Sequence, residues 1–142
     1  MKRVKDLLKA KGRDVWSIGS RASVYDAVHL MAEKEIGALL VMDGSELVGI
    51  FSERDYARQI ILKGRSSEKT RVSEIMTSNV VHAELDQETI QCMALMTDNR
   101  IRHLPIFDGT EVVGVISIGD LVRSIIAEQQ STIGDLEKYI SG

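Results

Sequence analysis

A tandem internal repeat is the feature of this sequence that most restricts the folds available to it. The segment DGSELVGIFSERD (43–55) returns as DGTEVVGVISIGD (108–120), and seven of its thirteen positions are identical. The spacing of 65 residues also holds upstream, where Met31 matches Met96. Two units that each expose an apolar face are expected to pack against each other about a pseudo-two-fold axis.

The repeat also divides the chain into parts. At the start of the copies the spacing becomes 68, since Val4-Lys5-Asp6-Leu7 aligns with Val72-Ser73-Glu74-Ile75. The first copy therefore carries about three extra residues near Lys11-Gly12-Arg13, which we interpret as a loop insertion. The segment KGRSSEKTR is polar and contains Gly and Ser, which is typical of a linker. The predicted parts are a first repeat (1–62), a linker (63–71), a second repeat (72–127) and a helical C-terminal extension (128–142).

Each copy has the pattern β-α-β-β-α, so we predict an α/β (α+β) fold made of two such repeats. Apolar residues at i, i+3, i+4 and i+7 predict the first helix of each copy, with Ser23 or Ser20 as its cap in the first. Pro105 cannot donate to a ladder, so its strand is expected at an edge or paired on one side only. In the first copy the predicted strands are 15–18, 38–42 and 47–51, and the second helix is 56–62. In the second copy the predicted strands are 80–83, 104–107 and 112–116, and the second helix is 121–127.

The last part of the chain continues past the second repeat. Ile133, Leu136 and Ile140 recur at i, i+3 and i+7, which predicts a short amphipathic helix after the region of Gly134. This helix could cover its own domain or dock on another subunit, and the pattern does not choose between them.

Composition excludes several classes of function. The net charge is −3 and aromatic residues make up 4% of the chain, so neither a nucleic-acid surface nor a base-stacking platform is expected. Cys92 is the single cysteine, and the three histidines show no ligand spacing, so we expect no disulfide and no metal site. No signal peptide or membrane-spanning run is present in the sequence, which favours a soluble, cytoplasmic protein.

The repeated phrase ends in Ser-x-x-Asp, at Ser52–Asp55 and again at Ser117–Asp120. One interpretation is structural: the serine caps the following helix and the aspartate lies in its first turn. The other is functional. A helix N-terminus with a serine hydroxyl favours a phosphate, and a carboxylate one turn later can accept the hydroxyls of a ribose. Gly49 and Gly114 would let a flat ring approach the strand. Both interpretations can hold together.

These features resemble a tandem pair of cystathionine-β-synthase-type (CBS) domains. The resemblance rests on the β-α-β-β-α order, on the D-G-x-E-x-V-G-h-h-S-x-x-D phrase that closes both units (h apolar), and on the RHLPI stretch at 102–106. It covers the chain from about Val4 to Ala127. It implies a regulatory module that binds an adenosine-containing ligand (AMP, ADP, ATP, S-adenosylmethionine or NAD(H)) between the repeats. Carried onto this chain, it assigns ligand contacts to Ser52 with Asp55 and to Ser117 with Asp120.

The two copies differ in their cationic groups. Arg54 aligns with a glycine of the second copy, whereas Arg102 and His103 align with Gly37-Ala38 of the first. Such groups suit phosphate, Arg through paired hydrogen bonds and His as a donor once protonated. Solvated surface charge explains Arg54 and Arg102 equally well, and a half-buried position at a strand edge explains His103. If they do face the ligand, the two sites are expected to differ in phosphate preference.

We found no base–nucleophile pair, so we expect no enzymatic activity. The favoured function is a stand-alone adenine-nucleotide sensor that acts on an unidentified protein partner. The resemblance also implies a homodimer, with 56–62 and 121–126 as its surfaces. The alternative is a structural dimerisation module whose clefts stay empty and whose serines are caps only.

Overall fold

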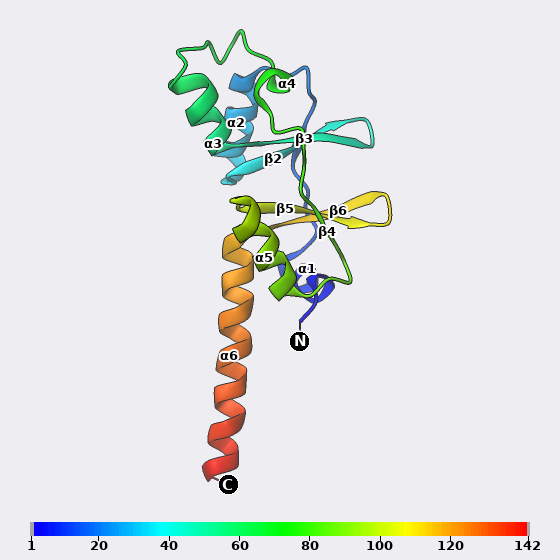
Figure 1. The fold of residues 1–142 in the computed structure, drawn as a ribbon, viewed down its shortest axis with the longest axis vertical. Helices are drawn as coiled ribbons and strands as arrows, with labels where there is room; N and C mark the ends of the chain where they lie inside the picture. The colour runs from blue at the N-terminus through cyan, green and yellow to red at the C-terminus, as the bar shows by residue number, and fades with distance from the viewer. Residues whose placement is uncertain (1, 142) are drawn as a thin grey trace. The chain divides into compact units, whose positions relative to one another are not determined.

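The computed structural model describes residues 2–141, without the side chain of Ser141. Figure 1 shows its helices and strands, and the β-α-β-β-α order occurs twice, as the sequence predicts. The elements of the first repeat are α1 (Val4–Lys11), β1 (Ser17–Ile18), α2 (Val24–Lys34), β2 (Ala38–Asp43), β3 (Glu46–Ser52), α3 (Glu53–Tyr56) and a π-helical segment η1 (Ala57–Ile61). Those of the second are α4 (Val72–Ile75), β4 (Ala83–Glu84), α5 (Thr89–Asn99), β5 (His103–Asp108), β6 (Glu111–Ser117) and α6 (Ile118–Ser141).

Two compact units form, and neither coincides with one repeat. The β1–β3 unit contains Asp14–Val81, so it includes α4 from the start of the second repeat. The β4–β6 unit joins the residues up to Arg13 with those from His82 onward, so it includes α1 from the start of the first repeat. The first helix of each repeat therefore belongs to the unit that contains the strands of the other repeat.

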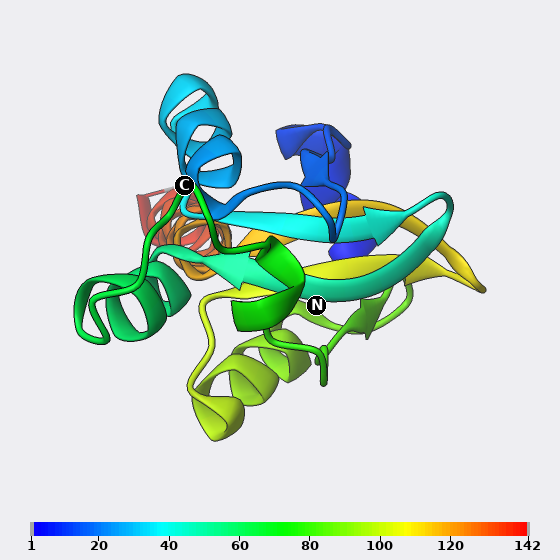
Figure 2. The same cartoon turned by 90° about the horizontal axis from the view of Figure 1, so that it is seen from above.

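The β1–β3 unit is a three-stranded sheet with helices α2, α3 and α4. β1 pairs parallel with β2, and β2 pairs antiparallel with β3 around the turn at Gly44. In Figure 2 this hairpin runs away from α2 and α3, with its turn at the far end. Ser23 caps α2 by accepting a hydrogen bond from the Asp26 N–H at 3.1 Å, which confirms one of the two predicted caps. The core of the β1–β3 unit contains Val24, Ala27, Met31, Leu39, Val41, Phe51, Ile60, Val72 and Ile75.

The β4–β6 unit repeats this arrangement with α1, α5 and α6. β5 is the central strand, which excludes the edge position predicted as one option for Pro105. Pro105 itself faces Val115 of β6, whereas β4 reaches only Ile106 and Phe107, so the proline is paired on one side as the second option predicts. Buried side chains of this unit are Val4, Leu7, Leu8, Ala83, Cys92, Met96, Leu104, Ile106, Ile116 and Leu121.

Several predicted bounds are corrected. The opening strands begin later than predicted, at Ser17 and Ala83, because these are the first residues of each run that pair in register with the central strand. The second helix of the first repeat begins at Glu53 and continues as a π-helix, in which the Leu62 N–H donates to the Ala57 carbonyl at 3.0 Å. The amphipathic helix predicted after Gly134 is not a separate element, because α6 is continuous from Ile118 and residues 128–132 contain neither proline nor glycine.

Candidate functional site

The first Ser-x-x-Asp end lies where β3 passes into α3. Ser52 caps the helix, and its Oγ accepts a hydrogen bond from the Asp55 N–H at 3.3 Å. The Asp55 Oδ2 atom in turn accepts from the Ser52 N–H at 2.9 Å and from the Ser52 hydroxyl at 3.1 Å. The other oxygen, Oδ1, accepts from the Thr77 hydroxyl at 3.3 Å. The capping interpretation is therefore correct, and the carboxylate has neutral donors around it.

The second end lies where β6 passes into α6 and has the same local geometry. The Asp120 N–H donates to the Ser117 Oγ at 3.2 Å, and the Ser117 N–H donates to the Asp120 Oδ2 at 2.8 Å. Its further donors are cationic. Lys11 Nζ lies 2.5 Å from Oδ2, and Arg123 Nη2 lies 2.8 Å from Oδ1. The Asp120 side chain is 10% exposed, so these charges act on a carboxylate with little contact with water.

The ionisation of Asp120 follows from these neighbours. Burial alone would raise the pKa of the Asp120 carboxyl. The hydrogen bond from Lys11, the hydrogen bonds from Ser117 and the Lys11 charge outweigh burial, so this pKa lies below its ordinary value. Asp120 is therefore an anion at neutral pH, ready to accept hydrogen bonds from hydroxyl groups.

Thr77 and Lys11 take corresponding places in the two units. In the β1–β3 unit the Thr77 N–H donates to the Ile50 carbonyl at 2.9 Å, and its hydroxyl reaches Asp55. In the β4–β6 unit Lys11 Nζ donates to the carbonyl of Val115, 65 positions after Ile50, at 2.5 Å, and also reaches Asp120. One long cationic side chain thus replaces a backbone N–H and a hydroxyl. The two ends share their geometry but differ in charge.

Gly49 and Gly114 do not leave space for a flat ring on the strand face that their missing side chains would occupy, contrary to the functional interpretation. A Cβ on Gly49 would lie 2.5 Å from Met76 Sδ and 3.0 Å from the Thr77 carbonyl oxygen. A Cβ on Gly114 would lie 2.9 Å from Leu8 Cδ2. The glycines are needed because the leading segment of the other repeat packs directly on the strand.

The helix starts also offer fewer free donors than the sequence argument assumes. The Glu53 N–H donates to the Gly37 carbonyl at 3.1 Å, and the Ile118 N–H donates to the Arg102 carbonyl at 2.8 Å. With Asp55 and Asp120 bonded to the cap serines, the first and third N–H groups of each helix have acceptors within the protein. An anion at these ends would depend on cationic side chains more than on the backbone.

The structure brings Arg102 and His103 to the Asp120 end. His103 opens β5 opposite Ser117, so the two side chains share one face of the sheet, and Arg102 bonds through its carbonyl to Ile118. Arg54 follows Ser52 by two residues and is exposed on α3. Because the Arg102 side chain is also exposed, a ligand role for these three residues stays a prediction.

Sequence reasoning did not assign Thr77, Lys11 or Arg123 to a site. Lys11 lies in the stretch where the first copy carries its extra residues, so aligning the repeats pairs it with no counterpart. Arg123 could have been found, because a residue three positions after Asp120 on a helix faces the same side. Lys11 could not, since only the packing of α1 on the distant β6 strand brings it there.

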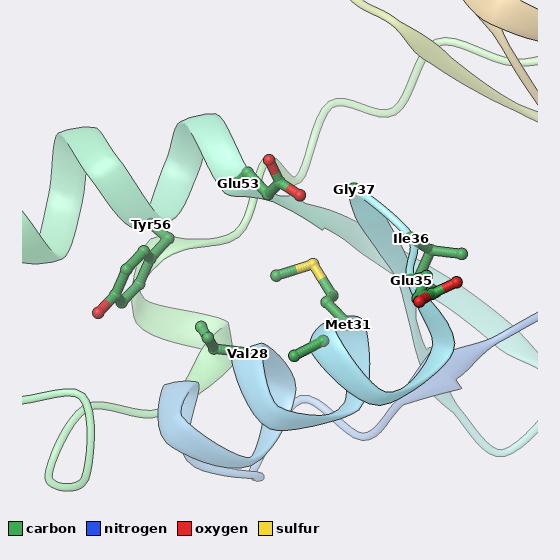
Figure 3. A pocket seen from close by; sticks show the side chains of 8 residues that line it. Val28, Met31, Glu35, Ile36, Gly37, Glu53 and Tyr56 are labelled. Atoms are coloured by element: carbon green, nitrogen blue, oxygen red, sulfur yellow. The ribbon is translucent and has the colours of Figure 1, made fainter.

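A separate hollow of about 380 Å³ lies in the β1–β3 unit. Val28 and Met31 of α2 and Tyr56 of α3 border it, with Glu35 and Glu53 at its margin (Figure 3). No cationic side chain is among its lining residues, so it does not suit a phosphate-bearing ligand. None of the residues predicted from sequence to bind a ligand borders it, although Glu53 follows Ser52 directly.

Metal centres and membrane-spanning helices are two other classes of feature. Within residues 2–141, no group of three or more His, Cys, Asp or Glu side chains is placed to hold a metal ion. Among the helices in this same range, none combines the length and the apolar character needed to cross a lipid bilayer.

Comparison with known proteins identifies the repeat. The sequence model of the CBS domain matches residues 4–62 and again residues 72–127. The chain belongs to the CBS domain family. It is a CBS domain pair, and the two three-stranded sheets, six helices and one π-helical segment within residues 2–141 agree with solved structures of such pairs.

Relatives extend over most of the chain. The mitochondrial CBS domain-containing protein CBSX3 of Arabidopsis thaliana is 39% identical over 149 aligned positions, which cover 98% of this chain and 72% of that protein. In three longer relatives from the same plant, the matched region makes up 22% of the protein. A putative signal-transduction protein with CBS domains from Burkholderia ambifaria has a structure with a TM-score of 0.87 and 54% identity, covering 90% of this chain and 96% of that one.

One structural neighbour contains adenosyl ligands. The CBS domain pair of protein MJ0100 was crystallised with 5′-methylthioadenosine and S-adenosyl-L-methionine. It has a TM-score of 0.79 and 26% identity, and the match covers 90% of this chain and 98% of that one.

Proposed function

We propose that this CBS domain pair is a non-catalytic regulatory module that binds an adenosine-containing nucleotide at its two Ser-x-x-Asp ends. The observation that carries the proposal is the repeated geometry in which an anchored carboxylate, Asp55 or Asp120, follows a capping serine in the turn after a strand. The adenosyl ligands of the MJ0100 pair support the ligand class.

The carboxylates are the proposed ribose contacts. Each is held in one orientation by the N–H of its serine, at 2.9 Å for Asp55 and 2.8 Å for Asp120. A carboxylate offers about four lone-pair directions, and three of them already accept hydrogen bonds at each aspartate. One direction is left for a ribose hydroxyl while the anchoring bonds remain. The low pKa of Asp120 keeps it charged, and hydrogen bonds to a charged acceptor are stronger than those between neutral groups.

The phosphate contacts would differ between the two ends. Lys11, Arg123, Arg102 and His103 lie in the unit that holds Asp120, and the first two contact its carboxylate. At the Asp55 end the corresponding donor is the neutral Thr77, and Arg54 is the nearest predicted cation in sequence. We therefore assign the more highly charged ligand, ADP or ATP, to the Asp120 end, and a less highly charged one, AMP or NAD(H), to the Asp55 end.

Regulation would follow from differential binding. A nucleotide that prefers one arrangement of the module shifts the population toward it, and a protein partner that recognises that arrangement responds. A homodimer stays a prediction. Of its proposed surfaces, Ile61, Leu62, Val122 and Ile126 are exposed, whereas Leu121 and Ile60 are buried and cannot contribute directly. A cytoplasmic location also stays a prediction, since the Arabidopsis relative is named as mitochondrial.

The experiment is a thermal-unfolding titration of the whole chain with adenosine, AMP, ADP, ATP, NADH and S-adenosylmethionine. A ligand at 100 times its Kd stabilises the folded state by about 2.7 kcal/mol. The wild-type protein should respond to at least one nucleotide, and the Asp55→Asn/Asp120→Asn double variant should not. Analysis of the nucleotide after incubation should recover it unchanged, whereas turnover would contradict the non-catalytic assignment.

Asp43→Asn is the matched control. Asp43 is also anchored by a serine, accepting from the Ser20 hydroxyl at 2.7 Å, but it lies at the hairpin turn, at the opposite end of β3 from Ser52. This variant should keep the ligand response of the wild type. If no nucleotide stabilises the wild-type protein, the Ser-x-x-Asp residues are caps only, and the alternative of a structural dimerisation module replaces the proposal.

A further inference from the structure

Helix α6 is longer than its own unit can cover. It contains 24 residues, and its beginning packs on the unit through the fully buried Leu121. From Gln129 to Ile140 every residue except Gly134 is exposed. Figure 1 shows this half of the helix continuing past α1, α5 and the strands of the same unit.

An apolar stripe follows one side of this helix. Its members alternate at spacings of four and three residues, which is the a and d pattern of a coiled-coil heptad. Their exposure is 42% at Val122 and 83% at Ile140, so the stripe is uncovered along its length. Apolar side chains aligned over several turns favour burial against another surface. The stripe consists of Val122, Ile126, Gln129, Ile133, Leu136 and Ile140.

The composition of the α6 stripe fits a second copy of this chain. Isoleucine at the a positions, with valine or leucine at two of the three d positions, is typical of two-stranded coiled coils. Gln129 is the one polar member, and a single polar position in such a seam selects a register. Its first two members, Val122 and Ile126, are 42% and 47% exposed, so the stripe is open to a partner from the start of the helix.

Charge complementarity favours an antiparallel pair. Arg123 and Glu137 both occupy e positions of the heptad. In an antiparallel pair the e positions face each other, which places Arg123 opposite the partner's Glu137. By symmetry Glu137 also faces the partner's Arg123, so the pair gains two such contacts. A parallel pair would bring Glu137 near the partner's Thr132 instead and would gain no ion pair. The expected layers are Ile126 with the partner's Leu136, Ile133 with the partner's Gln129, and Ile140 with the partner's Val122.

A lipid surface is a poorer occupant. Residues 128–141 contain three acidic residues and one basic residue, Lys138. Helices that lie on membranes carry an excess of Lys and Arg on the polar face, because cellular membranes are negatively charged.

We propose that the α6 stripe is a self-association surface through which two copies of this chain form an antiparallel two-stranded coiled coil. Apart from Arg123, whose guanidinium also contacts Asp120 and has enough N–H donors for a second carboxylate, the residues of this association lie outside the proposed nucleotide sites.

The test is the molar mass of the full chain, measured by sedimentation equilibrium at about 100 µM, a concentration that would populate a dimer of micromolar affinity. An Ile133→Asp/Leu136→Asp variant should have half the mass of the wild type, and its helix content should be unchanged. The matched control is Ala127→Asp/Ser131→Asp, which adds the same charge at exposed b and f positions of the same helix. It should keep the wild-type mass.

Two results would overturn the proposal: a wild-type protein that is monomeric at 15.8 kDa, or a stripe variant that keeps the wild-type mass. A monomeric wild type would leave the stripe to a different protein. The nucleotide response of the stripe variant should equal that of the wild type, so failure of this surface and failure of the nucleotide sites can be told apart.

A charge exchange tests the orientation. Arg123→Glu and Glu137→Arg should each weaken self-association in nucleotide-free protein, by about tenfold. The double variant should recover most of the wild-type affinity, because the exchanged charges again face each other in the antiparallel arrangement. A double variant no tighter than either single variant would overturn that arrangement.

Discussion

Lys11 Nζ lies 2.5 Å from the Oδ2 atom of Asp120, whereas the corresponding aspartate of the first repeat, Asp55, contacts the neutral hydroxyl of Thr77. The two ends of this CBS domain pair thus have the same capping geometry and different electrostatics. We expect this difference to give the two ends different ligand preferences. It arises from Lys11, a residue that neither repeat motif contains.

Removing the Lys11 ammonium should destabilise the fold. In Lys11→Met the carboxylate of Asp120, which is 10% exposed, loses one of its two cations, and Val115 loses the donor to its carbonyl. We expect a loss of about 1–2 kcal/mol in the free energy of unfolding, measured with urea. Lys9→Met on the same helix is the control, since Lys9 is exposed, and it should change stability by less than about 0.5 kcal/mol. Equal effects of both variants would contradict the role of the ion pair.

The Asp120 contacts also predict how stability depends on pH. Because the pKa of Asp120 is lower in the folded state than its unfolded value of about 3.9, its contribution is fully present above that value. It is lost as the pH falls through the lower, folded-state pKa. Urea titrations between about pH 6 and pH 2 should therefore show a shallower loss of stability for Asp120→Asn than for wild type. Parallel curves for the two proteins would contradict the prediction.

The two ends should discriminate differently between charged and neutral ligands. Asp55→Asn leaves the Asp120 end intact, and Asp120→Asn leaves the Asp55 end intact. Calorimetric titration should give a ratio of ATP affinity to adenosine affinity that is about tenfold larger for Asp55→Asn than for Asp120→Asn. The reason is that Asp55→Asn keeps the Asp120 end, where Lys11 and Arg123 lie. Arg123→Gln in that background should lower the ratio. Equal ratios for the two variants would show that the cations beside Asp120 do not select the ligand.

Gly49 should not tolerate a methyl group. In Gly49→Ala the new Cβ would lie 2.5 Å from Met76 Sδ and 3.0 Å from the Thr77 carbonyl oxygen, and the second neighbour belongs to the backbone. We expect a loss of about 1–3 kcal/mol in the free energy of unfolding. Gly19→Ala is the control, because nothing lies within 4 Å of its added Cβ and its backbone is not left-handed. Met76→Ala in the Gly49→Ala background should recover part of the loss, and full additivity of the two changes would contradict the packing argument.

Local features of this protein could be predicted from its sequence because they depend on neighbours along the chain. The Ser52–Asp55 and Ser117–Asp120 capping boxes join residues three positions apart, so the repeated letters determine their geometry. Helices α2 and α5 follow from the apolar period, and the hairpins follow from alternating strands around Gly44 and Gly109, whose φ angles of 63° and 64° suit glycine.

Tertiary packing decided the rest, because it joins residues that are distant in the sequence and whose contacts no periodicity encodes. Helix α1 packs on the strand that contains Gly114, and this brings Lys11 to Asp120. The segment after α4 packs on Gly49, and this brings Thr77 to Asp55. The same packing filled the space that the glycines had suggested for a ligand. Helix α6 crosses Gly134 without a break, since one glycine costs a helix about 1 kcal/mol and the turns on either side continue it.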